Sequence, residues 1–405
     1  MQDEFKNEVG NAEVSEYADV NTDKAEAKSL TDNEAANKDC GSENGILSEI
    51  SAKKDAQAAE KKRRKKLAKQ IAIPILSVLL FIFVLNILIL PLTGSYARVG
   101  SVNTYDGSNQ YITLGDESGP MLSAHRAGGD LAPEETLSAF KLCMESPDYS
   151  VDIVEFDLHL TKDGHLVLMH DHEVDRTSDG PIVFGKKKVK VQDKTLAELK
   201  TLNFGYNFQA PDGSYPYRNI DNVPDDVRIL TLDEVLSYLA EQRPDGDLTY
   251  IIEIKDKGRV GKEAMDKLYA AMEKFGITDK TIVGTFNGDI SKYIDDVYGG
   301  KVKRSAGILE VVNFYYAFLW GVNQNTEMLG YDVLQIPMGF NGFFDLSTKA
   351  FIDYAHSLGI AVQYWTINDE DDMRTLLKNG ADAIMTDNPE LAYAVKQDMV
   401  NNGEL

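Results

Sequence analysis

Cysteine is scarce in this chain, since its 405 residues include only Cys40 and Cys143. Two cysteines cannot form the disulfide framework on which small secreted domains depend. A chain of this length has room for a domain of about 250 residues or more, which buries enough apolar surface to fold without such bridges. We therefore expect one large domain stabilised by its own core, together with additional segments.

Charge is absent from residues 71–92, IAIPILSVLLFIFVLNILILPL, where Ser77 and Asn86 are the polar interruptions. About 20 apolar residues suffice to cross the roughly 30 Å of bilayer hydrocarbon. A buried core helix and a cleaved signal peptide are competing interpretations, but a signal peptide has a shorter apolar segment close to the N-terminus. Because residues 1–70 precede the run, the sequence predicts a transmembrane helix over residues 71–93.

Basic residues flank one side of this span. The run KKRRKKLAK, residues 61–69, precedes it, whereas the sparsely charged TGSYARVG follows it. The positive-inside rule then predicts a single-pass protein of the cell membrane, with a cytoplasmic N-terminus and an extracellular large domain. The basic run could also bind anionic lipid headgroups. This topology puts the two cysteines on opposite sides of the membrane, and a disulfide-free outer domain is compatible with a Gram-positive surface.

Apolar and aromatic residues are few in residues 1–50, which carry 13 acidic and 4 basic residues. Such a segment cannot bury enough surface to fold, so we expect residues 1–70 to be a disordered tail, acidic and then basic. Residues 51–70 have a net charge of +7, and the chain total of −23 leaves −21 for residues 71–405. An acidic domain repels nucleic acid, and an anionic substrate would need a local reversal of charge.

Short apolar runs alternate with amphipathic helical segments in the outer domain, a pattern that predicts parallel strands. Eight such units predict a closed (β/α)8 TIM barrel over residues 119–397, after a linker at 94–118 and before a tail at 398–405. The eight runs are residues 121–126, 152–160, 249–255, 281–286, 304–309, 333–338, 361–367 and 382–387.

A ninth apolar run, HLVLMH at residues 165–170, follows an Asp-Gly turn. The turn predicts a hairpin, so this run should pair antiparallel with the second strand and return His170 to the level of Asp157. Residues 172–230 have no clear period and are expected to form an insertion after the second strand. The aromatic segment 310–324 is expected to pack in the core or to face the membrane rather than line the barrel mouth.

Polar residues gather at the predicted strand ends, where the sites of such barrels lie. They are His125, Arg126, Glu155, Asp157, Glu253 and Lys255, and His170 joins them from the hairpin. We expect His159, His165 and His172 to be exposed and His356 to lie on a helix, and none of them receives a role.

Glu155 and Asp157 lie two residues apart on a strand and so share a face. With Glu253 on the next strand, three carboxylates would raise one another's pKa unless a cation lies between them. Oxygen ligands suit Mg2+ or Ca2+ better than Zn2+. Exposed carboxylates, and an ordinary surface ion pair between Glu253 and Lys255, are the alternatives.

In several motifs the chain resembles the glycerophosphodiester phosphodiesterases, whose barrel is related to that of bacterial phosphatidylinositol-specific phospholipases C. The likeness covers about residues 119–397. Its motifs are AHRAGGDLAPEETLSAF, EFDLHLTKDGHLVLMHD, TLAELKTLNFG, LTLDEVL, IEIK, YWTIN and GADAIMTDNP.

The resemblance implies a role for each candidate residue by position. His125 and His170 would be the acid-base pair, Glu155, Asp157 and Glu253 the ligands of Mg2+ or Ca2+, and Arg126 and Lys255 the phosphate-binding cations. Glu134 would support the site, and Trp365 and Phe286 would wall the glycerol pocket. The chain departs from the family pattern where Ala127 replaces a Gly and Glu135 replaces an Asn. The methyl group of Ala127 is harmless if the φ angle of this residue is negative. Glu135 is expected to add a negative charge near the site.

The implied reaction is hydrolysis of a glycerophosphodiester to glycerol 3-phosphate and an alcohol at the outer membrane face. Lysophospholipids and polyglycerol-phosphate wall polymers are alternative substrates for the same site. A glycoside hydrolase would also place two carboxylates at a barrel mouth, but it does not need the His125-Arg126 pair or Lys255. A lyase-type phospholipase C and a non-catalytic sugar-phosphate-binding module are two further candidate functions.

Overall fold

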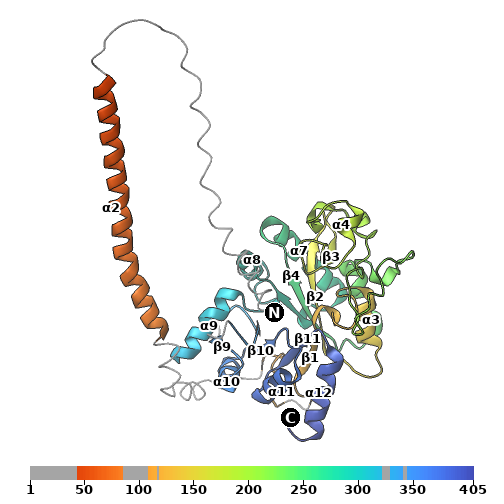
Figure 1. The fold of residues 1–405 in the computed structure, drawn as a ribbon. Coiled ribbons are helices and arrows are strands. Elements are labelled where there is room, and N and C mark those ends of the chain that lie inside the picture. The colour runs from red at the N-terminus through yellow and green to blue at the C-terminus, as the bar shows by residue number, and fades with distance from the viewer. Residues whose placement is uncertain (1–42, 85–107, 116–117, 322–328, 341–343) are drawn as a thin grey trace. The chain divides into compact units, whose positions relative to one another are not determined.

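The computed structural model describes residues 43–84, 108–115, 118–321, 329–340 and 344–405 (Figure 1). The chain divides into two compact units. One contains helix α2, Glu43–Val84, and the other contains the remaining helices and strands.

Helix α2 differs from the expected tail. Residues 43–70 are helical here, because Ala, Lys, Arg, Gln and Glu are strong helix formers. The part from Glu60 to Val84 is long and apolar enough to cross a membrane by length and composition. The end of the predicted span at residues 85–93 and the acidic tail at 1–42 lie outside the described residues.

The predicted (β/α)8 barrel is confirmed. Its parallel strands are β1 (Met121–Ala124), β2 (Ile153–Leu160), β4 (Thr249–Ile254), β5 (Thr281–Gly284), β6 (Lys303–Arg304), β7 (Val333–Ile336), β10 (Ala361–Tyr364) and β11 (Ala383–Thr386). They pair in the order β6-β5-β4-β2-β1-β11-β10-β7. A parallel bridge between Ser305 and Val333 joins the two outer strands and closes the ring.

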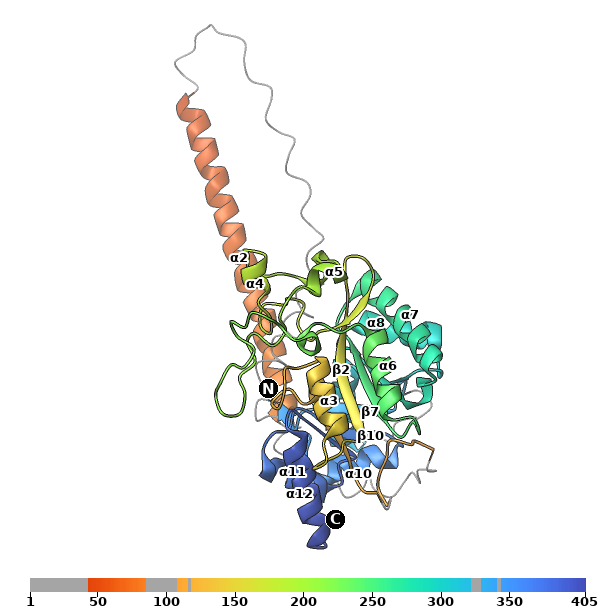
Figure 2. The same cartoon turned by 90° about the vertical axis from the view of Figure 1, so that its right-hand side faces the viewer.

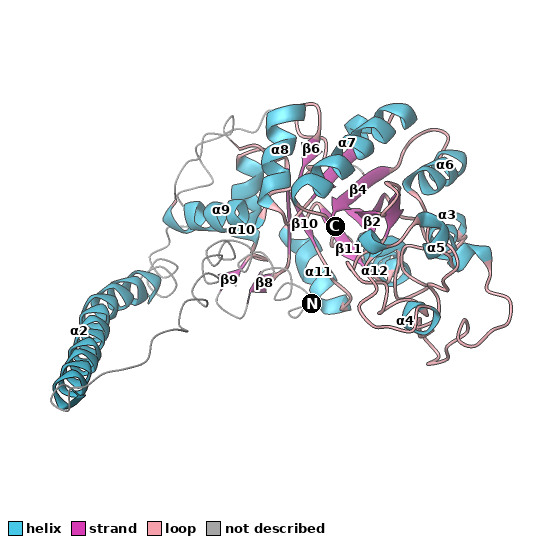
Figure 3. Ribbon diagram, turned by 90° about the horizontal axis from the view of Figure 1, so that it is seen from above, coloured by secondary structure: helices cyan, strands magenta, loops and turns pink. Residues whose placement is uncertain are grey.

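A helix follows each barrel strand and packs on the outside of the ring. Figure 3 shows the strands in the middle, with α3, α6, α7 and α8 among the helices around them. The eight helices are α3 (Leu137–Glu145), α6 (Leu232–Gln242), α7 (Gly258–Phe275), α8 (Gly288–Tyr298), α9 (Ile308–Trp320), α10 (Lys349–Ser357), α11 (Glu370–Asn379) and α12 (Pro389–Asn401).

Apolar side chains fill the lower interior of the barrel. Several strands each contribute one of these side chains. Part of the expected linker closes the bottom of the barrel and forms its floor, since Tyr111 packs in the same cluster and is 2% exposed. The cluster includes Tyr111, Ile112, Ile153, Ile251, Ile282, Val333, Ala361, Ala383 and Met385. Because side chains alternate along a strand, the polar residues further along β2 and β4 face the same interior, above this floor.

The hairpin after β2 forms as expected. Strand β3, Leu166–Leu168, pairs antiparallel with β2, and the Met169 amide donates to the Asp157 carbonyl at 3.0 Å, which brings His170 to the level of Asp157. The insertion at 172–230 contains the short helices α4 (Gly180–Val183) and α5 (Leu196–Leu199) and a small apolar core of its own. Figure 2 shows α5 near the tip of the hairpin, where the Leu196 amide donates to Asp163.

Helix α9 carries the aromatic segment that was expected to pack in the core. Its inner face does so, since Phe314, Tyr315, Phe318 and Leu319 are buried. Its outer face is exposed and apolar, with Leu309, Val312, Tyr316 and Trp320. Part of the segment, residues 322–324, lies outside the described residues. Two short strands that were not expected, β8 (Gly339–Phe340) and β9 (Phe344–Asp345), pair with each other after β7.

Candidate active site

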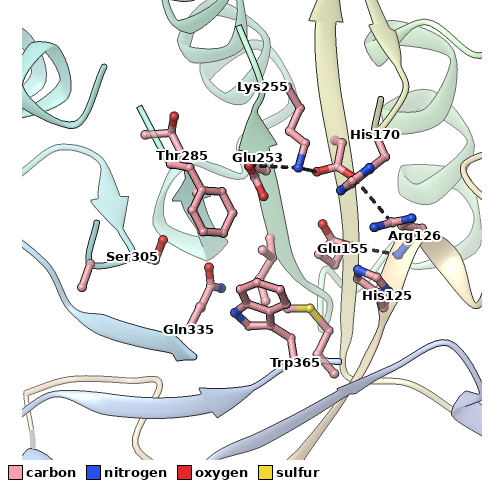
Figure 4. A pocket seen from close by; sticks show the side chains of 16 residues that line it. His125, Arg126, Glu155, His170, Glu253, Lys255, Thr285, Ser305, Gln335 and Trp365 are labelled. Atoms are coloured by element: carbon pink, nitrogen blue, oxygen red, sulfur yellow. Dashed lines mark hydrogen bonds and ion pairs between the residues drawn. The ribbon is translucent and has the colours of Figure 1, made fainter. Parts of the chain in front are cut away.

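One pocket at the barrel mouth collects nine of the ten predicted site residues (Figure 4). They are His125, Arg126, Glu155, Asp157, His170, Glu253, Lys255, Phe286 and Trp365. The tenth, Glu134, lies in an adjoining pocket that His125 and Arg126 also line. The main pocket is open to solvent, and the empty space in it, its open mouth included, is about 630 Å3.

Strand pairing brings the carboxylates together. Asp157 on β2 lies beside Glu253 on β4 in parallel register, and Glu155 precedes Asp157 on the same face. Glu155 and Asp157 are 4% and 1% exposed. The predicted burial therefore holds for Glu155 and Asp157, whereas Glu155, Asp157 and Glu253 do not bring three oxygens within 4.8 Å of one another.

Two cationic side chains offset part of this negative charge. Lys255 Nζ lies 3.3 Å from Asp157 Oδ1 and 3.1 Å from Glu253 Oε1. Arg126 Nη1 lies 3.5 Å from Glu134 Oε1, and its Nε lies 3.9 Å from Asp157 Oδ2. The Arg126 backbone amide also donates to Glu155 Oε2 at 2.7 Å. The site thus has the local positive charge that an anion would need in this acidic domain.

The charge balance leaves room for a divalent cation. Burial and the charge of Asp157 raise the pKa of Glu155. The two carboxylates therefore disfavour each other's ionised form. Asp157 Oδ2 is buried and accepts no hydrogen bond. Glu155, Asp157 and Glu253 fit a hard cation in the chemistry of their oxygens. Lys255 Nζ lies between Asp157 and Glu253.

Each predicted histidine is held by an aspartate. His125 Nδ1 lies 2.6 Å from Asp387 Oδ1, and His170 Nδ1 lies 2.8 Å from Asp171 Oδ1. Neither aspartate was assigned a role from the sequence, although both lie in quoted motifs, Asp387 at the end of a predicted strand and Asp171 directly after one. Such pairing fixes the orientation and tautomer of an imidazole.

The two imidazoles differ in proton affinity. Burial and Arg126 would lower the pKa of His125, but the hydrogen bond and charge of Asp387, with the charge of Glu155, raise it overall. Burial and the Lys255 ammonium lower the pKa of His170, against the effects of Asp157 and Asp171. At neutral pH the pair is therefore biased toward one protonated and one neutral ring.

Arg176 connects the insertion to the mouth and was also missed by the sequence analysis. Its Nη1 and Nη2 donate to the two oxygens of Glu134 at 2.7 and 2.6 Å, and its Nε donates to Asp171 Oδ2 at 2.7 Å. Although burial raises the pKa of Glu134, the charges of Arg126 and Arg176 lower it overall. Glu134 therefore stays ionised and holds both guanidinium groups.

The two residues that depart from the family pattern, Ala127 and Glu135, are both buried and both have a positive φ. Ala127 has φ 61°, so its methyl group occupies the left-handed region that favours glycine, and the harmless case at negative φ does not apply. Glu135 has φ 56° and is buried, and its Oε1 accepts from the Asp157 amide at 2.6 Å. Burial, and then the charges of Asp157 and Glu134, raise its pKa well above the usual value. Glu135 is therefore biased toward its neutral form, and the expected added charge is suppressed.

One expectation about the other histidines was wrong. His159 is fully buried, because β2 continues beyond the barrel into the hairpin, where β3 and the insertion cover it. His165 and His172 are exposed, as expected, and His356 lies on α10. His356 is buried and bonds Asp382 at 2.8 Å.

Phe286 and Trp365 lie together on the apolar side of the pocket, with ring centroids 5.8 Å apart in an edge-to-face arrangement. Ile251 and Met385 also line the pocket, and Thr285, Ser305 and Gln335 provide further polar groups (Figure 4). The pocket thus has a charged side and an aromatic side, as a small phosphate ester with an organic part would require.

Comparisons with known proteins agree with this geometry. A model of the glycerophosphoryl diester phosphodiesterase family matches residues 125–391. A glycerophosphodiester phosphodiesterase of Caldanaerobacter subterraneus subsp. tengcongensis is 30% identical over 273 residues, which are 67% of this chain and 95% of the relative.

Solved structures share the fold. A phosphodiesterase of Oleispira antarctica, determined with the product sn-glycerol-3-phosphate, is 23% identical, with a TM-score of 0.52 over 69% of this chain and 97% of that one. A glycerophosphodiester phosphodiesterase from Agrobacterium tumefaciens is 19% identical, with a TM-score of 0.50 over 68% of this chain and 99% of that one. From the family match and the Caldanaerobacter relative, this chain belongs to the glycerophosphoryl diester phosphodiesterase family.

Proposed function

We propose that the barrel hydrolyses glycerophosphodiesters to glycerol 3-phosphate and an alcohol by acid-base catalysis with His125 and His170. The observation that carries the proposal is the histidine pair itself. Each ring is fixed by its own aspartate, the two pKa values are shifted in opposite directions, and both rings face a pocket that also holds Arg126 and Lys255. The names of the relatives support the same reaction.

The opposite shifts suggest a division of labour between the rings. His170, biased toward the neutral form, removes a proton from the nucleophile, which is water or the neighbouring glycerol hydroxyl. Attack by the hydroxyl would expel the alcohol and form a cyclic phosphate, which water then opens to glycerol 3-phosphate. His125, biased toward the protonated form, donates a proton to the oxygen of the departing alcohol. Arg126 and Lys255 hold the phosphate oxygens, and Phe286 and Trp365 pack against the glycerol. Glu134 keeps Arg126 in position.

Glu155, Asp157 and Glu253 would hold a Mg2+ or Ca2+ ion. When bound, such an ion supplies Lewis-acid stabilisation of the phosphate charge. We expect chelation with EDTA to abolish turnover and added Mg2+ or Ca2+ to restore it, and a fully active chelated enzyme would remove the metal from the proposal.

Turnover of glycerophosphocholine by the full chain in detergent tests the reaction, with release of glycerol 3-phosphate as the readout. His125→Ala and His170→Ala should each lower kcat by about 10²–10⁴-fold, the usual scale of acid-base contributions, with metal content unchanged. Normal turnover in both variants would refute the assignment. A chromogenic glycoside that is hydrolysed instead, or binding of glycerophosphocholine without turnover, would favour the glycoside hydrolase or the binding module.

We also propose that α2 anchors the enzyme, with residues 1–70 in the cytoplasm and the barrel outside. The length and composition of Glu60–Val84, with the basic run 61–69 ahead of its apolar part, support this topology. Carbonate extraction should leave the full chain in the membrane and release a chain that lacks residues 1–93. An anchored site outside the cell would reach lysophospholipids and polyglycerol-phosphate polymers, so both belong in the substrate panel.

A further inference from the structure

Three side chains form a second cluster beside the pocket. His159, His172 and Asp256 each place one ligand atom so that all three atoms lie within 4.8 Å of one another, and no other group of three histidine, cysteine or acidic residues does so in the described part of the chain. None of the three lines the main pocket. The proposed reaction gives them no task.

The buried member of this cluster has an atom without a partner. His159 is fully buried, and its Nδ1 lies 2.6 Å from Asp256 Oδ1. An ionised carboxylate can only accept, so Nδ1 carries the proton and the lone pair of the neutral ring is on Nε2. Nε2 is buried and has no hydrogen-bond partner. An unsatisfied buried polar atom destabilises the fold, and a ligand on Nε2 would remove that cost.

Asp256 is fixed in this orientation. Besides His159, its Oδ1 accepts from Gln192 Nε2 at 2.6 Å, and its Oδ2 accepts from the Leu160 amide at 2.7 Å. A histidine that binds a metal usually donates its other ring N–H to a carboxylate in this way. Asp256 and His159 therefore have the arrangement of a metal-binding imidazole with its supporting carboxylate.

The second imidazole lies on the open side. The ring centroid of His172 is 4.7 Å from that of His159, at an interplanar angle of 52°, and His172 is exposed, so solvent reaches this side of the cluster. Imidazole pairs select transition metals, whereas Mg2+ and Ca2+ prefer oxygen. We propose that His159 Nε2 and His172 bind a divalent transition-metal cation of the zinc type, with Asp256 as the supporting carboxylate.

The position of this site would connect it to the active site, a consequence that rests on the proposed function. His159 follows Asp157 by two residues, His172 follows His170 by two residues, and Asp256 directly follows Lys255. An ion bound here would hold together the three backbone segments that carry a carboxylate, a histidine and a phosphate-binding lysine. Its binding should therefore stabilise the hairpin and the start of the insertion.

Cobalt titration of the full chain in detergent tests the site, because Co2+ with imidazole ligands absorbs in the visible. The chain carries no polyhistidine tag and is first treated with a chelator and then saturated with Mg2+ and Ca2+. We expect the band to saturate at one equivalent in the wild type and in His165→Ala, a control that removes an exposed histidine of the same hairpin. His172→Ala should abolish the band, and Asp256→Asn should weaken Co2+ binding about 10–100-fold.

Zn2+ should raise the Tm of the wild type and of His165→Ala but not of His172→Ala, as expected for a ligand that binds only the folded state. No band in the wild type, or an unchanged band in His172→Ala, would overturn the site. Because His172 is on the surface, its variant should fold, and a wild-type melting transition without metal checks this. Turnover of glycerophosphocholine is measured separately, so failure of the metal site and failure of the proposed reaction are distinguishable.

Discussion

At the scale of single residues, the two histidines of the pocket owe their different protonation to their neighbours. His125 faces Asp387 and Glu155, whereas His170 is buried beside the Lys255 ammonium. A difference in environment of this kind lets two identical side chains act as acid and base at one pH. The sequence identifies the histidines, but the aspartate partner of His125 is 262 residues away along the chain.

The pH profile of turnover tests this division. Because Asp387 raises the pKa of His125, Asp387→Asn should lower it. His125 must be protonated to act as the acid, so turnover is lost as pH rises through its pKa, and the alkaline limb should move to lower pH in this variant. Asp171 raises the pKa of His170, so Asp171→Asn should move the acidic limb to lower pH instead. If neither limb moves, or both variants move the same limb, the assignment of acid and base is wrong.

Glu135 gives a second prediction at this scale, on stability. Burial and the charges of Asp157 and Glu134 raise the pKa of Glu135 in the folded state above its unfolded value. The contribution of Glu135 to the free energy of unfolding is therefore fully present below the unfolded pKa, and it is lost as pH rises toward the folded pKa. Glu135→Gln can still accept from the Asp157 amide and cannot ionise. The Tm of the variant should therefore exceed that of the wild type by more at pH 8 than at pH 5, and a constant difference would show that Glu135 is not held neutral.

At the scale of elements, the hairpin of β2 and β3 carries His170 to the mouth, and its turn depends on Gly164 at φ 83°. Alanine in the left-handed region costs roughly 1–2 kcal/mol, and a Cβ on Gly164 would meet only the ends of flexible side chains. Gly164→Ala should therefore lower both Tm and kcat, because the strained turn loosens the strand that precedes His170.

Gly185 provides the matched control for this change. It has φ 63° in the insertion, and a Cβ there would meet nothing within 4 Å. Gly185→Ala should lower Tm by a similar amount and leave kcat near the wild-type value. Equal losses of kcat in the two variants would mean that global destabilisation, and not the hairpin, accounts for the effect.

The elements also show what sequence patterns could and could not predict. Seven of the eight apolar runs became barrel strands, because strands buried on both faces are rich in apolar residues. The strand β6, Lys303–Arg304, overlaps the predicted run 304–309 only at Arg304, and the end of that run belongs to α9. The exposure of His159 was predicted wrongly. The alternation of side chains along a strand shows which residues lie on the same face, but it does not show that β3 and the insertion cover that face. The positive φ of Ala127 and the link from Arg176 to Glu134 depend on tertiary contacts that no local pattern encodes. Residues 43–70 became helical because helix propensity outweighs charge repulsion along the basic run.

At the scale of the whole molecule, a strongly acidic chain binds an anion. Residues 71–405 have a net charge of −21, and a field of that sign repels a negative substrate over tens of ångströms. Arg126 and Lys255 act only at contact distance, within the pocket. The long-range repulsion and the local attraction should therefore respond differently to salt.

Ionic strength separates the two effects. Raising it from about 10 mM to 150 mM shortens the Debye length from about 30 Å to about 8 Å, which screens the domain's field but hardly alters contacts inside the pocket. The ratio of kcat/KM for anionic glycerophosphoglycerol to that for zwitterionic glycerophosphocholine should rise with KCl at constant Mg2+, because only the anion is repelled by the domain. A ratio that falls with salt would mean that positive charge dominates the approach to the mouth, and that the acidic surface lies away from the path of the substrate.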